Sequence, residues 1–273
     1  MRCLGASKPL RCYDGYVFDL DGTIYLGDEL LPGALDVVTE LQRRGARLLF
    51  LSNNPTRDPA MYVKKLASMG LDVTLEQILN PVVTMSAWLK ANMPDAAVFV
   101  IGEGPLQRAI ANAGLRLSDD PSEIDVVVAS YDRGFTYQKL QIAFDAMRVH
   151  RRARLVTTNP DAYCPMPGGR GEPDSAAIVA AIEACTGAKC EANLGKPDRL
   201  MIDSVLGMLH LQAHSCLLVG DRLYTDIAMA IDSGMDSALV LSGESTWETV
   251  LAVEPDRRPL YVLEDLYDLL APR

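Results

Sequence analysis

The stretch 17–23, VFDLDGT, places Asp19 and Asp21 at the end of an apolar run and directly before a glycine. The run, residues 16–20, is otherwise continuously hydrophobic, as expected of a strand that is buried on both faces of a parallel sheet. Ligands of open α/β sheets bind beyond the carboxyl ends of such strands. An acidic pair is costly there unless something binds it, so the stretch predicts a ligand site as well as a strand.

Similar apolar runs recur along the chain and alternate with amphipathic helical segments. They are ARLLFLS (46–52), AVFVIG (97–102), DVVVAS (125–130), RLVTTN (154–159), CLLVGD (216–221) and SALVLSG (237–243). Helices are expected over 32–45, 136–150 and 174–187. The glycine- and proline-rich stretch 164–173 is expected to be a loop. The alternation predicts the α/β fold class, with a Rossmann-like, doubly wound parallel sheet as the core.

The composition limits the partners that the chain can have. Its 273 residues are 49% hydrophobic, which is enough for a full core, and carry a net charge of −10. Nucleic acids and anionic membranes bind basic surfaces, so neither is expected as a partner. The six cysteines form no CxxC pair, the N-terminus lacks the apolar region of a signal peptide, and no run reaches the ~18 apolar residues of a membrane helix. We therefore expect a reduced, cytoplasmic protein.

Two further motifs place polar side chains where a phosphate could bind. Ser52, Asn53 and Asn54 end the second apolar run and can donate hydrogen bonds to a phosphate oxygen, although Ser-Asn-Asn is by itself more often a helix-capping turn. Lys196 stands in a Gly-Lys-Pro sequence before a predicted helix. It is either a mobile positive charge for a ligand or a solvated surface lysine.

A fourth motif, GDRLYTD, places Asp221 and Asp226 after another apolar run. Such carboxylates could cap a helix or bind a hard cation. Two unit charges ~4 Å apart repel by about 4 kcal/mol at an effective dielectric of ~20, so Asp19 and Asp221 would need a cation between them if they came together. Oxygen ligands beside a phosphate favour Mg²⁺. One crevice with a Mg²⁺ ion and a phosphate would account for all four motifs.

The four motifs DLDGT, SNN, GKP and GDRLYTD resemble, in order and separation, those of the haloacid dehalogenase superfamily of phosphatases. The long insertion between SNN and GKP resembles that of the NagD-like subfamily, which includes nitrophenyl phosphatases. Two other stretches share the resemblance, YDRGFTY (131–137) and TNPDAYCP (158–165). It implies a catalytic core of residues 1–80 and 191–273, with an inserted α/β cap of residues 81–190 that closes over the crevice.

The resemblance also implies an activity, namely a Mg²⁺-dependent phosphatase acting on a small phosphorylated metabolite through a covalent aspartyl-phosphate. Sugar phosphates, nucleoside monophosphates and nitrophenyl phosphate are the expected substrates. Asp19 would be the nucleophile and a metal ligand. Asp21 would act as general acid and base, with its backbone carbonyl on the metal. Asp221 would bind Mg²⁺ directly, and Asp226 would orient water or Lys196 without contacting the metal. The residues expected on the phosphoryl group are Gly22, Ser52, Asn53, Asn54 and Lys196.

Several alternatives stay open at this point. A phosphomutase would retain Asp21, and a catalytically silent member could bind a phosphorylated metabolite and regulate through its cap. Arg170, in the stretch 164–175, would either recognise the leaving group or lie in solvent. By resemblance to relatives whose caps pair, a homodimer through the cap is the favoured assembly.

Overall fold

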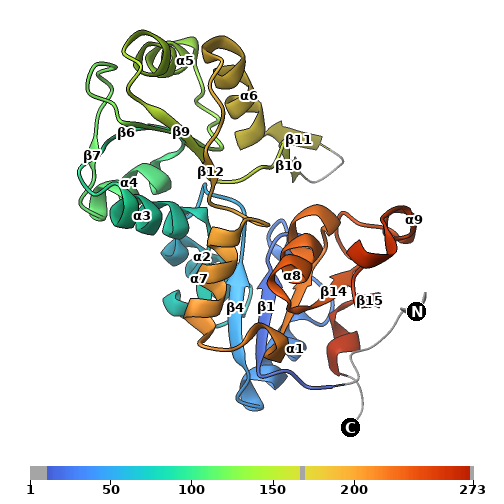
Figure 1. Ribbon diagram of the computed structural model, residues 1–273. Helices are drawn as coiled ribbons and strands as arrows, with labels where there is room; N and C mark the ends of the chain where they lie inside the picture. The colour runs from blue at the N-terminus through green and yellow to red at the C-terminus, as the bar shows by residue number, and fades with distance from the viewer. Residues whose placement is uncertain (1–10, 167–169, 271–273) are drawn as a thin grey trace. The chain divides into compact units, whose positions relative to one another are not determined.

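The computed structural model describes residues 11–166 and 170–270, which fold into two compact units (Figure 1). The first unit comprises the residues up to 52, residues 63–79 and the residues from 196 onward. The second comprises residues 53–62 and 80–195. In the described parts of the chain, no helix has both the length and the apolar character needed to cross a membrane.

The first unit is built on a six-stranded sheet in the order β15-β14-β13-β1-β4-β5, in which every neighbouring pair is parallel. Its strands are β1 (Gly15–Asp19), β4 (Arg47–Leu51), β5 (Ile78–Leu79), β13 (Cys216–Gly220), β14 (Asp236–Val240) and β15 (Tyr261–Leu263). All five residues of β1 are buried, as the apolar run predicts. The chain builds outward from β1 to β4 and β5, then returns to the other side of β1 with β13, so the strand order reverses between β1 and β13.

Helices connect these strands. They are α1 (Ala34–Arg43), α2 (Pro59–Ser68), which crosses the division between the units, α7 (Arg199–Leu209), α8 (Ala228–Ser233) and α9 (Trp247–Ala252). The helix predicted over 32–45 is α1, which buries one apolar face against the sheet. It begins after Gly33 rather than at Pro32, and the chain leaves it through the left-handed residue Gly45. A short π-helical turn, Leu223–Ile227, leads from β13 into α8.

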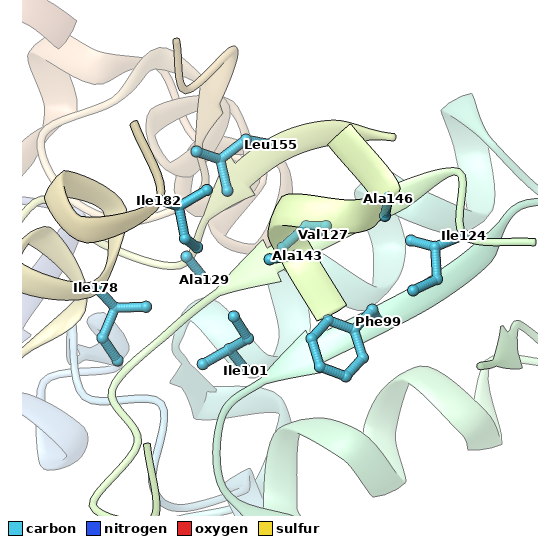
Figure 2. Close-up of a cluster of buried hydrophobic side chains, with 10 residues drawn as sticks. All are labelled: Phe99, Ile101, Ile124, Val127, Ala129, Ala143, Ala146, Leu155, Ile178 and Ile182. Atoms are coloured by element: carbon cyan, nitrogen blue, oxygen red, sulfur yellow. The ribbon is translucent and has the colours of Figure 1, made fainter. Parts of the chain in front are cut away.

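The second unit contains a five-stranded parallel sheet in the order β12-β9-β8-β6-β7. Its strands are β6 (Ala97–Ile101), β7 (Arg116–Leu117), β8 (Val126–Ala129), β9 (Arg154–Thr157) and β12 (Ala192–Asn193). Its helices are α3 (Pro81–Asn92), α4 (Gly104–Asn112), α5 (Tyr137–Phe144) and α6 (Ser175–Thr186). Figure 2 shows how α6, through Ile178 and Ile182, packs with the strand residues Val127 and Leu155 in one apolar core. The predicted α/β class is confirmed.

One local prediction is wrong. The stretch 164–173, expected to be a loop, contributes to an antiparallel hairpin of β10 (Tyr163–Met166) and β11 (Arg170–Pro173). Glycine and proline are normally depleted in strands, but a two-stranded ribbon tolerates them where no central ladder is interrupted. Residues 167–169 of this stretch lie outside the described residues.

The structure also differs from the predictions directly after the first strand and in the helix predicted over 136–150. The short strands β2 (Tyr25–Leu26) and β3 (Glu29–Leu30) pair as a small antiparallel hairpin in the first unit, directly after the VFDLDGT stretch. The helix predicted over 136–150 is α5 only up to Phe144, after which a π-helical turn continues over Asp145–Val149.

Candidate active site

The candidate site lies in the first unit, at the carboxyl ends of its central strands. Asp19 is the last residue of β1, Ser52 directly follows β4, and Asp221 directly follows β13. Strands β1 and β13 are the neighbours between which the strand order reverses. Side chains that leave parallel strands at such a switch point converge on one crevice.

A buried lysine joins two of the predicted carboxylates. The Nζ atom of Lys196 lies 2.5 Å from Oδ1 of Asp19 and 2.7 Å from Oδ1 of Asp226. Lys196 is 2% exposed and Asp226 0%. Lys196 lies just before α7, whose first turn is capped by the side chain of Asp198. The Gly-Lys-Pro lysine is therefore not a solvated surface lysine.

The ionisation of this cluster is set by burial and by mutual charge. Burial alone lowers the pKa of Lys196, but the adjacent carboxylates outweigh it and raise that pKa above its usual value. Burial raises the pKa of Asp19, and Lys196 opposes the rise. Burial and the charge of Asp226 raise the pKa of Asp221 to about 7. The lysine is therefore a cation among carboxyl groups that are costly to ionise together.

The carboxylates fit a divalent cation. Oxygen atoms of Asp19, Asp221 and Asp226 lie within 4.8 Å of one another, and the ammonium of Lys196 contacts the first and the last of these carboxylates. The buried Oδ1 atom of Asp221 meets no hydrogen-bond donor among the residues that the structure describes. A buried oxygen left in that state is costly unless a cation or water completes it. An all-oxygen donor set is the one that Mg²⁺ prefers.

Asp221 and Asp226 differ in the groups that their carboxylate oxygens contact. Oδ1 of Asp226 accepts from Lys196, and its Oδ2 accepts from the backbone N–H of Arg222 at 3.1 Å. Oδ2 of Asp221 accepts from the backbone N–H of Glu244 at 2.7 Å, while its Oδ1 accepts from none of the described residues. Asp221 therefore has an oxygen that could bind a metal, whereas the two oxygens of Asp226 bind Lys196 and the backbone of the turn.

Two glycines make room for Asp221. Gly22 has φ +91°, and a Cβ atom added to it would come within 2.5 Å of Oδ2 of Asp221. A Cβ atom on Gly243 would also collide with that carboxylate. The hydroxyl of Ser242 donates to the carbonyl of Gly22 at 3.0 Å, so the loop after β14 is tied to the turn after β1. Both positions need glycine because the backbone approaches the carboxylate closely.

Asp21 lies in the turn that follows β1 and is partly exposed. The hydroxyl of Tyr25 donates to Oδ2 of Asp21 at 3.0 Å. The N–H of Gly22 donates to the carbonyl of Tyr25 at 2.8 Å, which closes the turn on itself. The carboxyl group of Asp21 is therefore held by a side chain from the same short segment.

The remaining predicted residues divide between the units. Ser52 is buried in the first unit, where its N–H donates to the carbonyl of Leu79 at 3.1 Å. Asn53 and Asn54 belong to the second unit. Asn53 donates to Asp161 there at 3.2 Å, and Oδ1 of Asn54 accepts from the following turn. Arg170 is an exposed residue of β11, also in the second unit.

Sequence reasoning missed Tyr25 and the loop formed by Ser242, Gly243 and Glu244. The loop follows the apolar run 237–243, so the strand-end argument that identified Asp19 and Asp221 applies to it equally. Tyr25 offered no comparable signal, because its contact with Asp21 depends on the shape of one turn rather than on a spacing rule.

Comparisons with known families and proteins agree with this geometry. A family model for haloacid dehalogenase-like hydrolases matches residues 16–116, and a HAD-hydrolase-like model matches residues 193–269. The sugar-phosphatase AraL of Bacillus subtilis is 35% identical over 255 residues, which is 93% of this chain and 91% of the relative.

Solved structures are similar along almost the whole chain. The 4-nitrophenylphosphatase of Thermotoga maritima has a TM-score of 0.89 at 32% identity and covers 95% of this chain and 97% of its own. A glycerol phosphate phosphatase of Mycobacterium tuberculosis, solved in complex with magnesium, has a TM-score of 0.85 at 28% identity. The match covers 97% of this chain and 78% of that one.

Proposed function

Because this chain belongs to the NagD-like phosphatases of the haloacid dehalogenase superfamily, we propose that it hydrolyses a small phosphorylated metabolite through a covalent phosphoryl-Asp19 intermediate, with Mg²⁺ bound. The observation that carries the proposal is the buried Lys196, held at 2.5 Å from Asp19 and 2.7 Å from Asp226 beside the open oxygen of Asp221. A buried lysine in contact with a potential nucleophile is suited to the charge that phosphoryl transfer develops.

In the proposed first step, a carboxylate oxygen of Asp19 attacks phosphorus and the bond to the leaving oxygen breaks. Asp21 gives its proton to that oxygen and becomes a carboxylate. In the second step, Asp21 takes a proton from a water molecule as the water attacks phosphorus. The bond between phosphorus and Asp19 then breaks and inorganic phosphate is released. Dividing the displacement in two is the recognised use of a carboxylate nucleophile.

The other residues supply charge and orientation. Lys196 neutralises negative charge on the transferring phosphoryl group, and Asp226 keeps the ammonium in place through its own 2.7 Å contact. The hydroxyl of Ser52, which follows the neighbouring strand, donates a hydrogen bond to a phosphoryl oxygen. Asn53 and Asn54 remain predicted phosphate ligands, although their side chains have partners in the second unit.

The carboxylates of Asp19 and Asp221, with the backbone carbonyl of Asp21, would hold the metal. Bound Mg²⁺ supplies positive charge that allows an anionic phosphate to approach this acidic cluster. Gly22 and Gly243 keep the Asp221 carboxylate where it can serve as a ligand.

A sugar phosphate is the substrate class that we favour. Similarity to the sugar-phosphatase AraL over 93% of the chain supports this choice. The phosphate-binding groups contact only the part that all substrates share, so selectivity belongs to the rest of the molecule. We assign it to the proposed cap, residues 81–190, and keep Arg170 as its candidate contact with the leaving group.

Phosphate release from a panel of sugar phosphates, nucleoside monophosphates and nitrophenyl phosphate tests the proposal. We expect the highest kcat/KM for a sugar phosphate, loss of activity with EDTA and recovery with Mg²⁺. Arg170→Ala in the same panel should lower kcat/KM for some substrates and not for others. Binding of these compounds without phosphate release from any of them would identify a silent binder instead.

A further inference from the structure

Tyr25 is a fully buried residue placed next to the proposed acid and base. It is 0% exposed, and its hydroxyl donates to Oδ2 of Asp21 at 3.0 Å. Its backbone is fixed as well, because its N–H donates to the carbonyl of Leu20 at 3.1 Å and its carbonyl accepts from Gly22 at 2.8 Å. The position of the hydroxyl is therefore determined by the turn that also carries Asp21.

The ring of Tyr25 is held from its face by a lysine. The Nζ atom of Lys65, in the part of α2 that belongs to the first unit, lies 3.7 Å from the ring centroid. Its side chain is only 13% exposed, and its Nζ atom also lies 3.8 Å from Oδ1 of the exposed Asp28. A desolvated cation over an aromatic face is among the stronger contacts of this kind. A tyrosine fixed at its backbone and its ring can orient the group that its hydroxyl binds.

We infer that Tyr25 is a positioning residue for the proton that is delivered to the leaving group. By binding Oδ2 of Asp21, its hydroxyl leaves Oδ1 to carry that proton. The proton moves from Oδ1 to the leaving oxygen as the bond to phosphorus breaks. In the second step, Oδ1 recovers a proton from the attacking water. Tyr25 itself gains and loses no proton. The inference rests on the proposed function.

The inference predicts an effect that depends on the leaving group. Tyr25→Phe removes one hydroxyl and keeps the ring. Nitrophenolate leaves with little help from an acid, whereas an alkoxide needs its proton. General acid catalysis contributes roughly 10²- to 10⁴-fold, so an Asp21 free to rotate should lower kcat/KM for glycerol phosphate or a sugar phosphate by about 10- to 100-fold. For nitrophenyl phosphate the loss of kcat/KM, which reports only the steps up to the departure of the leaving group, should stay below about threefold.

Tyr13→Phe is the matched control. The Tyr13 hydroxyl is also buried and bonded, to Oδ2 of Asp236 at 2.7 Å and to the Tyr261 hydroxyl at 3.1 Å. It lies before β1, whereas Tyr25 lies after it. The control therefore makes the same chemical change at the other end of the same strand, and kcat/KM for both substrates should be unchanged.

Further variants make the result decisive. In an Asp21→Asn background, adding Tyr25→Phe should cause no further loss, because the group that it positions is gone. Lys65→Gln removes the cation from the ring of Tyr25 without changing Asp21. It should give the same dependence on the leaving group with a smaller loss of activity, and it replaces Tyr25→Phe as the test if that variant does not fold.

The results also separate this inference from the proposed function. If Tyr25→Phe lowers kcat/KM equally for both leaving groups, or for neither, the role of Tyr25 is overturned. The proposed function is still supported in that case, provided that the wild-type protein is active and Asp19→Asn is inactive. If wild-type protein with Mg²⁺ releases no phosphate from either compound, or if Asp19→Asn stays active, the proposed function itself fails.

Discussion

Both units place polar side chains at the carboxyl ends of parallel strands, yet the two edges differ in charge and in hydrogen bonding. In the second unit the edge combines hydroxyl and amide groups with the buried carboxyl groups of Asp161 and Asp174, which accept hydrogen bonds from neutral donors. The hydroxyl of Thr158 donates to Ser130 at 2.9 Å, that of Thr157 donates to the carbonyl of Ala129 at 2.9 Å, and Asn159 donates to Asp174 at 3.3 Å. These groups satisfy one another, and they link the ends of β8 and β9 to the start of α6.

In the first unit the corresponding edge carries a buried ammonium among three carboxylates, and one carboxylate oxygen meets no donor in the described part of the chain. A satisfied polar network stabilises a fold, whereas a cluster with unbalanced charge is stable only when a ligand completes it. Strand-end polarity alone therefore does not identify an active site. What distinguishes the first edge is a buried ammonium in contact with two carboxylates, with oxygen atoms of three carboxylates within 4.8 Å of one another.

The largest effect should come from removing the nucleophile. Asp19→Asn should lower kcat by on the order of 10⁴-fold, because an amide cannot form the covalent intermediate. Asp174→Asn makes the same change at a buried aspartate of the second unit and should leave kcat for nitrophenyl phosphate within about threefold. Steady-state phosphate release measures both. If kcat fell equally in both variants, the edge of the first unit would not be distinguished from that of the second.

Lys196 should be the next most sensitive position. Lys196→Met leaves Asp19 and Asp226 without their shared counter-ion, and kcat should fall by about 10²- to 10³-fold because transition-state charge is no longer neutralised. Breaking a buried pair costs about 3–5 kcal/mol, so urea unfolding should detect a loss of stability of that size. An active, fully stable variant would contradict the assignment.

A smaller effect is expected from the glycine that contacts the proposed metal ligand. In Gly243→Ala the new methyl group meets the Asp221 carboxylate, and overpacking of this kind costs about 1–3 kcal/mol. The Mg²⁺ concentration for half-maximal activity should therefore rise about tenfold, since about 1.4 kcal/mol corresponds to a factor of ten. Gly207→Ala, in α7 with no heavy atom within 4 Å of the added carbon, should leave that concentration unchanged.

The second unit should respond to pH through Asp174. Burial raises its pKa to about 6 from a usual value of 3.8, so the folded state binds a proton that the unfolded chain has released. The contribution of Asp174 to the free energy of unfolding should therefore be greatest below about pH 4, fall as the pH rises through 6, and be lower by up to about 3 kcal/mol at neutral pH. Urea titrations from pH 4 to 7.5 measure this change. Asp174→Asn, which mimics the neutral carboxyl group, should reduce the pH dependence by this amount and leave the part that comes from Asp19 and Asp221, whose pKa values are also raised. An unchanged pH dependence in that variant would contradict the role of Asp174.

How much the sequence predicted depends on the range of the forces involved. Continuous apolar runs identify β1, β4 and β13, because burial on both faces of a sheet leaves a strong local pattern. The positions of Asp19 and Asp221 then follow from the topology of such sheets. The hairpin of β10 and β11 was missed because its glycine and proline residues have low strand propensity. Tyr25 and the N–H of Glu244 act through individual contacts across turns, for which one sequence contains no periodic signal.

The proposed mechanism requires a phosphoryl group on Asp19, and this intermediate can be observed directly. Protein mixed with nitrophenyl phosphate and Mg²⁺ is quenched in acid during turnover, reduced with borohydride to convert any acyl phosphate to an alcohol, and mapped by peptide mass spectrometry. We predict conversion at Asp19 that requires Mg²⁺ and is absent in Asp19→Asn. Conversion at another residue, or turnover with no trapped acyl phosphate in a rapid-quench time course that resolves the first cycle, would contradict the account.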